Sequence, residues 1–400
     1  MKLIHLNFNL YSITIIFLLS IYLINPLNFG YLAGYLIAAL ILVNGSFVLK
    51  NLDMDLLLLL LYSTIYALFY SFDFESQGKQ FIAIYAITPP VFYLAGKFLV
   101  KDKPSSNIIY YILFGISILY SISALISVFL NFYEGGFVQL QRSIPFFWGG
   151  QPVSATVMGS FFTLNMCIPA LLILSKGKKG LIFNVIAIVT FVISLICVLR
   201  LGSRTQLGIF LIMTIFAFLY MLPKQSIKQN VILIGLVCLV IYYISTKVSF
   251  NMNADWLTTF SDRMDSSGGN IASGGGRTER WVKSFEYLFK YPLGWDLKEF
   301  GYSHNLWLDV LRAVGIIPFF ILIIYSIRSV KQIYKTTKLN RKATDFNGQV
   351  MVYFLAFFAL FMVEPIMEGI FGSFALFCLF KGVINKYYTN ELEISTIKKQ

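Results

Sequence analysis

Apolar segments long enough to cross a bilayer recur along the whole chain, and they constrain its fold more than any other feature. In lipid such a segment must satisfy its backbone hydrogen bonds internally, which an α-helix does. Hydrophobic residues make up 58% of the 400 residues and charged residues 13%. A soluble domain of this size has no core that could bury so much apolar surface. The sequence therefore predicts an all-α polytopic membrane protein.

About twelve segments have the length and composition of a membrane-spanning helix. The first follows a short, weakly charged start without a small-residue cleavage site, so we expect a retained helix rather than a signal peptide. No internal repeat is visible, and residues 1–400 are expected to form one domain. The predicted spans are about 6–24, 29–49, 54–72, 81–99, 108–132, 154–174, 181–199, 206–222, 231–249, 304–327, 349–364 and 368–385.

The lysines indicate how these spans are oriented. Short cytoplasmic loops of membrane proteins carry an excess of Lys and Arg. Placing both termini in the cytoplasm puts most lysines inside, whereas the opposite orientation puts them outside. The chosen orientation leaves one large loop on the outer face, residues 250–303, before the tenth span, and a smaller one at 134–153.

Two other classes of function are disfavoured. The net charge of +13 could indicate nucleic-acid binding, but the basic residues lie in loops between apolar runs rather than in a soluble basic domain. The four cysteines lie within apolar runs and have no CxxC spacing, so neither a disulfide nor a zinc site is expected. We expect no metal and no cofactor.

The large outer loop has two parts. "MDSSGGNIASGGGR" has the composition of a flexible linker and lacks the spacing of a phosphate-binding loop. "RTERWVKSFEYLFKYPLGW" predicts an amphipathic helix that ends before Pro292, with Trp281, Phe285, Leu288 and Phe289 on one face. Such a helix either lies on the membrane surface or packs on the ends of the spans, and both alternatives stay open.

Arginine is distributed differently from lysine. The chain has nine arginines and 23 lysines, and six of the arginines fall on the predicted outer face. The planar guanidinium grips phosphate oxygens in pairs, so this set predicts a lipid-linked phosphate or diphosphate as ligand. Lipid headgroups, or outer acids such as Asp262 and Glu279, are the alternative partners. The six are Arg142, Arg200, Arg204, Arg263, Arg277 and Arg280, and the i, i+4 spacing of Arg200 and Arg204 predicts a shared helical face.

The segment "SHNLWLDVLRAVG" starts a predicted span with a histidine. An interfacial histidine such as His304 can accept a proton from a sugar hydroxyl near neutral pH; a hydrogen bond to loop backbone is the alternative role. Asp309 precedes Arg312 by three residues and is expected to pair with it, which makes both charges tolerable in a membrane. Glu364 and Glu368 are also spaced i, i+4 and lie near the outer face, where acids within the membrane mark a pathway, a site or an ion pair with a nearby arginine.

These segments resemble the O-antigen ligase and polymerase superfamily. "GGGRTERWVKSFEYLFKYPLGW" followed by "SHNLWLDVLRAVGIIPF" is similar to its outer-loop signature, and "LGSRTQLGIF" and "RSIPFFWGGQPVSATVM" resemble two further arginine-containing elements. The matching residues are Arg142, Arg204, Gly276–Arg277, Trp281, Pro292, Gly294, His304–Asn305 and Gly315.

The resemblance implies a multipass glycosyltransferase on the outer face of the cytoplasmic membrane, most like a Wzy-type O-antigen or capsular polysaccharide repeat-unit polymerase. Its donor is an oligosaccharide carried on undecaprenyl diphosphate. By resemblance, Arg277 and Arg204 hold the diphosphate and His304 activates or orients the acceptor hydroxyl. The remaining assigned residues are Arg142, Arg200 and Arg280 for the diphosphate, and Asn305, Asp309, Arg312, Glu364 and Glu368 in support.

The chemistry of such a transfer suits arginine. Cleavage of a glycosyl–diphosphate bond develops negative charge on the leaving group, which fixed cations stabilise, so no metal is required. A polysaccharide ligase that moves a finished glycan to another acceptor is one alternative, and a lipid-linked-oligosaccharide flippase is another. A flippase needs charges along a central cavity, whereas here they gather on one face, which favours the enzyme. A flippase and a chain-length regulator are candidate partners.

Overall fold

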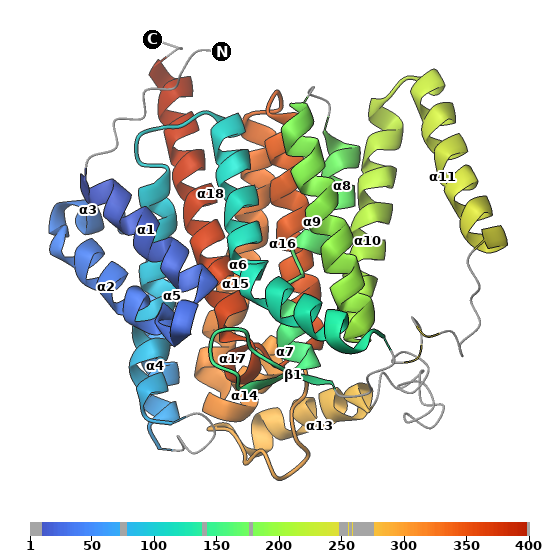
Figure 1. Cartoon of the computed structure of the whole chain (residues 1–400). Coiled ribbons are helices and arrows are strands. Elements are labelled where there is room, and N and C mark those ends of the chain that lie inside the picture. The colour runs from blue at the N-terminus through green and yellow to red at the C-terminus, as the bar shows by residue number, and fades with distance from the viewer. Residues whose placement is uncertain are drawn as a thin grey trace. The chain divides into compact units, whose positions relative to one another are not determined.

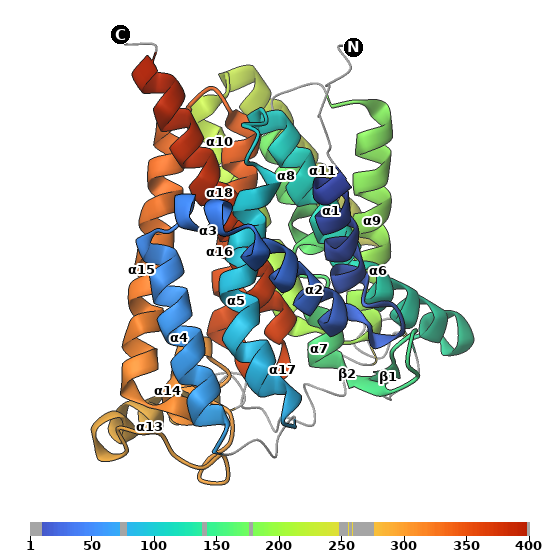
Figure 2. The same cartoon turned by 90° about the vertical axis from the view of Figure 1, so that its left-hand side faces the viewer.

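The computed structural model describes residues 10–72, 78–137, 142–175, 179–247, 255, 258 and 276–397. These residues are predominantly helical, and their strands form one short antiparallel pair, β1 (Ser143–Pro145) and β2 (Pro152–Ser154). Contacts divide the chain into two compact units. Unit 1 comprises Met1–Ser123, Arg280–Arg341 and Pro365–Gln400, and unit 2 comprises Ala124–Glu279 and Lys342–Glu364. Figures 1 and 2 label the elements.

Six helices among the described residues are long and apolar enough to cross a membrane. The prediction of a helical protein rich in spanning segments is confirmed to that extent. The six are α5 (Gln80–Leu99), α6 (Ser106–Gly135), α9 (Leu181–Arg200), α10 (Arg204–Met221) with the short 3-10 turn η3 (Leu222–Lys224), α15 (Ile316–Leu339) and α16 (Thr344–Val363). Shorter apolar helices are α1 (Leu10–Ile24), α2 (Gly30–Val43), α4 (Met54–Tyr70) and η2 (Asn165–Cys167) with α8 (Ile168–Leu174).

The long C-terminal helix α18 (Phe371–Ile397) and α5 run side by side in unit 1 (Figures 1 and 2). Their backbones touch at two glycines: a Cβ on Gly96 would lie 2.0 Å from the carbonyl oxygen of Leu379, and one on Gly382 would lie 1.9 Å from that of Tyr93. Small residues allow such close approach between membrane helices. The helices α2 and α4 pack on α5, and α15 packs on α4 and α18.

A group of paired charges, several of them buried, joins four of these helices in unit 1. Asp55, at the start of α4, is 2% exposed in its side chain and lies 2.9 Å from Lys381 Nζ of α18. Arg328 Nε of α15 donates to the same carboxylate at 2.5 Å. Beside them Lys97 of α5 pairs with Asp53. Burial of these ions is tolerable because each has a partner of opposite charge.

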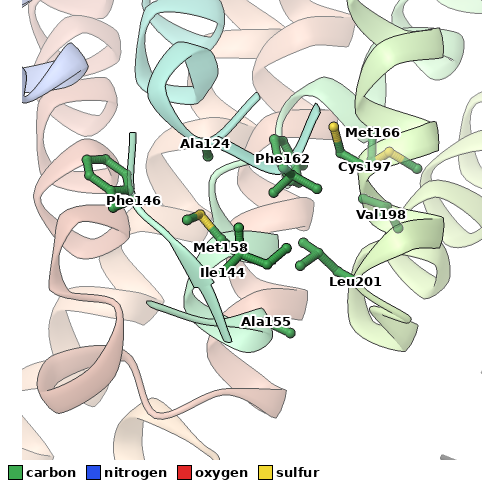
Figure 3. Close-up of a cluster of buried hydrophobic side chains, with 11 residues drawn as sticks. Ala124, Ile144, Phe146, Ala155, Met158, Phe162, Met166, Cys197, Val198 and Leu201 are labelled. Atoms are coloured by element: carbon green, nitrogen blue, oxygen red, sulfur yellow. The ribbon is translucent and has the colours of Figure 1, made fainter. Parts of the chain in front are cut away.

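Unit 2 has its own apolar core, which Figure 3 shows in close-up. Side chains from the second half of α6, the β1–β2 hairpin, α7 (Ala155–Ser160) and α9 meet there. The helix α10 packs on α8 and α16, and α8 packs on α9 and α16. The core residues are Ala124, Val128, Ile144, Phe146, Ala155, Met158, Phe162, Met166, Cys197, Val198 and Leu201.

Several predicted spans are interrupted. The segment 304–327 forms two helices, α14 (Leu306–Val314) and α15, which meet at Gly315 with a φ of 82°. The segment 154–174 divides into α7, η2 and α8. These two continuous spans were wrong predictions, because hydrophobicity does not reveal where the backbone leaves the helical conformation. The segment 29–49 likewise divides into α2 and α3 (Gly45–Lys50).

The remaining elements follow the sequence more closely. The amphipathic helix α13 (Arg277–Lys290) ends just before Pro292, as predicted. The predicted last span, 368–385, corresponds to the end of the short helix α17 (Ile366–Gly369) and to α18. The helix α18 continues well beyond the predicted end of that span. The helix α11 (Ile227–Lys247) lies in unit 2, and the 3-10 turn η1 (Pro26–Asn28) joins α1 to α2 in unit 1.

Candidate functional site

The Pro-x-Gly turn after α13 is hydrogen-bonded to the C-terminal end of α14. The backbone N–H of Trp295 donates to the carbonyl oxygen of Arg312, and that of Ile316 donates to the carbonyl oxygen of Pro292, both at 2.9 Å. Gly294 has a φ of 104°, and a Cβ there would lie 2.3 Å from the Arg312 carbonyl oxygen. Gly315 is equally constrained, because a Cβ on it would lie 2.4 Å from the Pro292 carbonyl oxygen. Only glycine fits either position.

This junction explains part of the motif found in the sequence. Pro292 and Gly294 are separated from Gly315 by the segment that contains α14, but the three residues meet in one backbone contact in unit 1. The turn therefore fixes where α14 ends, and α13 lies beside α14 in Figures 1 and 2.

The helix α13 also holds the segment that precedes α14. Trp281 Nε1 donates to the carbonyl oxygen of Ser303 at 2.9 Å, and the hydroxyls of Ser284 and Ser303 share a hydrogen bond of 2.9 Å. The residues of the predicted apolar face differ in burial. Trp281 packs inward, whereas Phe285 and Phe289 are 58% and 80% exposed. One face of the helix packs on unit 1, and another presents aromatic side chains outward.

His304 has an unusual backbone conformation. Its φ of 54° lies in the left-handed region, which non-glycine residues seldom occupy. The carboxylate of Asp309 accepts the backbone N–H groups on both sides of it, from Ser303 at 2.7 Å and from Asn305 at 3.1 Å. The Asn305 side chain caps α14 by accepting two backbone N–H groups of its first turn. Asp309 and Asn305 together fix the position of the histidine.

The acids and bases of α14 pair differently from the prediction. Asp309 was expected to pair with Arg312, but Arg312 forms its ion pair with Glu368 of α17. The guanidinium of Arg312 also lies 5.5 Å from the ring centroid of Tyr302. Asp309 instead binds loop backbone, because its side chain points to the N-terminal end of α14. Burial raises the pKa of Asp309 to about 6, against the opposing effects of the Arg312 charge and the two backbone donors.

Unit 2 gathers a second charged group, the arginine cluster: Arg142, Arg204, Arg277 and Glu364. Arg142 precedes β1, Arg204 and Arg277 begin α10 and α13, and Glu364 follows α16. Arg277 Nη2 lies 3.9 Å from Glu364 Oε1, and the hydroxyl of Thr205 donates to the same oxygen at 2.7 Å.

The cluster has more positive charge than negative. Burial lowers the pKa of Arg142, the charge of Arg204 lowers it further, and Glu364 raises it. Three arginines and one glutamate leave two positive charges uncompensated within the cluster, by the count 3 − 1 = 2. Such a surplus at partly exposed side chains suits an anion with several oxygens.

The other predicted phosphate ligands have different surroundings. Arg200 ends α9 and is fully buried at 0% exposure, whereas Arg204 is exposed at the start of α10. The turn between them contains Gly202 with a φ of 58°, so the predicted shared helical face was wrong. Arg280 Nη1 donates to the carbonyl oxygen of Tyr302 at 3.0 Å in unit 1. Arg263 lies outside the described residues.

The two acids near the end of the chain also separate. Glu364 has an extended backbone, with φ −136° and ψ 152°, and Pro365 follows it, so the predicted i, i+4 helical pair does not form. Glu364 belongs to unit 2 and Glu368 to unit 1, and each forms an ion pair with an arginine of its own unit. Of the alternatives given for these acids, the structure shows ion pairs with arginine.

Two residues with evident contacts were missed from the sequence. Thr205 binds Glu364, and Tyr302 lies against Arg312. Each lies within two residues of a predicted site residue, and that proximity was the only available signal. Among the described residues no three His, Cys, Asp or Glu side chains are grouped so as to hold a metal ion.

The predicted site residues thus fall into two groups. Unit 2 contains Arg142, Arg200, Arg204, Arg277 and Glu364, and unit 1 contains Arg280, His304, Asn305, Asp309, Arg312 and Glu368. No protein-family model matches the chain, and no curated protein matches it either. The resemblance to the O-antigen ligase and polymerase superfamily therefore depends on the motifs quoted above.

Proposed function

We propose that the protein is a multipass membrane glycosyltransferase that polymerises undecaprenyl-diphosphate-linked oligosaccharide repeat units into O-antigen, capsular polysaccharide or exopolysaccharide. The observation that carries the proposal is the arginine cluster of unit 2, with its two uncompensated positive charges. A diphosphate presents several anionic oxygens, and arginine forks bind such groups in pairs.

In the proposed reaction the arginines act on the leaving group. The bond between the anomeric carbon and the diphosphate breaks, and the acceptor hydroxyl oxygen forms the new glycosidic bond. Undecaprenyl diphosphate departs with the bonding electrons. Arg142, Arg204 and Arg277 stabilise the negative charge that develops on it, an effect worth about 3 kcal/mol of barrier for each well-placed donor.

His304 is assigned to the acceptor. Its imidazole accepts the proton that the hydroxyl loses as the new bond forms, which is the role of a general base. The left-handed backbone at His304, held by Asp309, supports this role because strained and over-determined residues often occur at functional sites. Arg280, Asn305, Arg312 and Glu368 support the segment around it.

The proposal includes a topology. About twelve spans, cytoplasmic termini and an outward-facing loop at 250–303 place His304 and Arg277 on the outer face of the cytoplasmic membrane. The six described helices of spanning length are compatible with it. A flippase that delivers the donor and a regulator of chain length are proposed as partners.

The experiment that tests the proposal uses purified protein in nanodiscs, with undecaprenyl-diphosphate-linked repeat units as the sole substrate. Separation of the products by size is expected to give a ladder in multiples of the repeat. The ladder is lost in His304→Ala and retained in His5→Ala, the same change at the chain's other histidine.

Other outcomes would point elsewhere. Transfer only after a second lipid or protein acceptor is added would identify a ligase. Movement of the intact lipid-linked oligosaccharide across the bilayer, with no new glycosidic bond, would overturn the enzyme in favour of transport. An unchanged ladder in His304→Ala would remove the histidine from the site.

A further inference from the structure

Unit 1 contains a groove that the proposed reaction does not use. Its volume is about 340 Å³, and it lies between α1, α5, α6 and the turn that joins the last two helices. Leu19, Phe98, Ile112 and Gly115 are among the apolar residues that line it. The rim is polar, with Ser12, Lys101 and Asp102. An apolar groove with a few polar groups at one end suits a ligand of the same polarity pattern.

Two uncharged side chains contact the ammonium group of the lysine on the rim. Lys101 Nζ donates to the hydroxyl of Ser12 at 3.1 Å and lies 3.9 Å from the ring centroid of Phe98. By contrast, Lys103 lies 2.7 Å from a carboxylate oxygen of Glu393. None of the ion pairs formed by the described residues includes Lys101. Its charge is therefore available to an anion.

The second rim charge limits which anion fits. Asp102 lines the groove beside Lys101 and is exposed. One lysine and one aspartate favour a headgroup with a single negative charge over one with several, because like charges repel. A phosphodiester carries a single negative charge and meets this requirement. A diphosphate carries additional negative charge, which Lys101 alone does not neutralise.

The groove also lies far from the residues of the proposed site in unit 1. Near the start of α5, the hydroxyl of Tyr85 donates to the carbonyl oxygen of Met367, the neighbour of Glu368, at 3.0 Å. At its other end, Asn390 of α18 donates to the carbonyl oxygen of Val100 at 3.0 Å, next to Lys101. The 20 residues of α5 correspond to roughly 30 Å, a membrane thickness.

We propose that this groove binds one acyl chain of a bilayer glycerophospholipid whose single phosphate contacts Lys101. The apolar lining gives little preference by itself, because lipid tails are as apolar as the side chains that line the groove. Selectivity must therefore come from the contact between the phosphate and the ammonium group. This inference goes beyond the proposed glycosyltransferase and does not depend on it.

The test is native mass spectrometry of the full chain in detergent, with phosphatidylglycerol as the added lipid. One tightly bound lipid is expected for the wild type. Lys101→Ala is expected to weaken this binding about tenfold, as for loss of a charged hydrogen bond. Lys103→Ala, the same change two residues away, is expected to leave it unchanged.

A second pair of variants tests the groove itself. An added Cβ at Gly115 meets no atom within 4 Å, and Gly115 lines the groove, so Gly115→Leu places its side chain in the groove and is expected to abolish binding. Gly208→Leu, at an equally open glycine of α10, is the control. Equal affinity in Lys101→Ala and Lys103→Ala, retained binding in Gly115→Leu, or tighter binding of undecaprenyl phosphate than of phosphatidylglycerol would each overturn the proposal.

Discussion

The two charged groups that contain the predicted site residues differ in balance and in burial. In unit 1, Arg312 and Glu368 pair one to one, with side chains 6% and 11% exposed. In unit 2, three arginines surround the single carboxylate of Glu364, and the Arg277 side chain is 30% exposed. A balanced buried pair holds its own helices together, whereas an unbalanced cluster with partly exposed arginines retains positive charge for a ligand. Arginine content alone does not distinguish these roles.

The largest effect is expected from a substitution that breaks the balanced ion pair of Arg312 and Glu368. Glu368→Gln leaves the buried Arg312 without a counter-charge and should lower the free energy of unfolding by about 3–5 kcal/mol. Denaturant titration of the detergent-solubilised protein measures it. The double variant Arg312→Met with Glu368→Met should recover most of the loss, since an apolar pair removes both buried charges. A loss below about 1 kcal/mol in Glu368→Gln would contradict the structural role.

The next largest effect is expected from a substitution that lowers activity but leaves stability nearly unchanged. Arg277→Ala should reduce the initial rate of polymerisation by about 10²–10³-fold, as expected for a lost contact to the leaving group. Its free energy of unfolding should change by less than about 0.5 kcal/mol, because the side chain is partly exposed and its ion pair is long. Arg341→Ala, at an exposed arginine outside the predicted site, is the control. A large loss of stability in Arg277→Ala would mean that Arg277 has a structural role like that of Arg312.

A third prediction concerns pH. The folded pKa of Asp309 is about 6, above the ordinary carboxyl value of about 3.9. The folded state therefore binds more protons than the unfolded state between these values, so stability is fully present below about pH 4 and falls as pH rises through 6. The loss should approach about 3 kcal/mol. Arg312, Glu368 and Tyr302 are the charged and titratable groups that act on or beside Asp309.

The measurement is the free energy of unfolding between pH 4 and 7 for the wild type and Asp309→Asn. The difference between the two curves isolates this carboxyl from other groups that titrate in the window. Asp309→Asn should have the smaller slope. Parallel curves would mean that burial does not raise the pKa of Asp309.

The smallest effect is expected from a substitution that removes the negative charge of the arginine cluster. Glu364→Gln keeps an acceptor for Thr205 but removes the negative charge beside Arg277. Binding of the lipid-linked donor should tighten a few-fold at low salt and less at high salt, because the ion pair is long and the partly exposed Arg277 is screened by salt. The KM for the donor measures this, with Glu279→Gln as the control. Weaker binding would show that Glu364 supports the ligand rather than competing with it.

Parts of the candidate site could be found from the sequence because they depend on residue type. Arginine was singled out by its chemistry, and the left-handed His304 lies where the motif placed the histidine. The partners were not predictable. Asp309 and Arg312 share the unbroken helix α14, but Asp309 binds loop backbone and Arg312 pairs with Glu368 of another helix. Between Glu364 and Glu368 the helix is interrupted at Pro365, so their spacing does not place them on one helical face.

The sequence by itself determined that the chain is helical and rich in segments long and apolar enough to cross a membrane, because apolar length and composition are local properties. It also located α13 and its end, since proline stops a helix locally. The tertiary structure alone decided that Gly294 and Gly315 form one junction, that Asp309 holds the backbone around His304, and which acid neutralises which arginine. Those outcomes depend on backbone conformation and on contacts between distant segments, which hydrophobic periodicity does not contain.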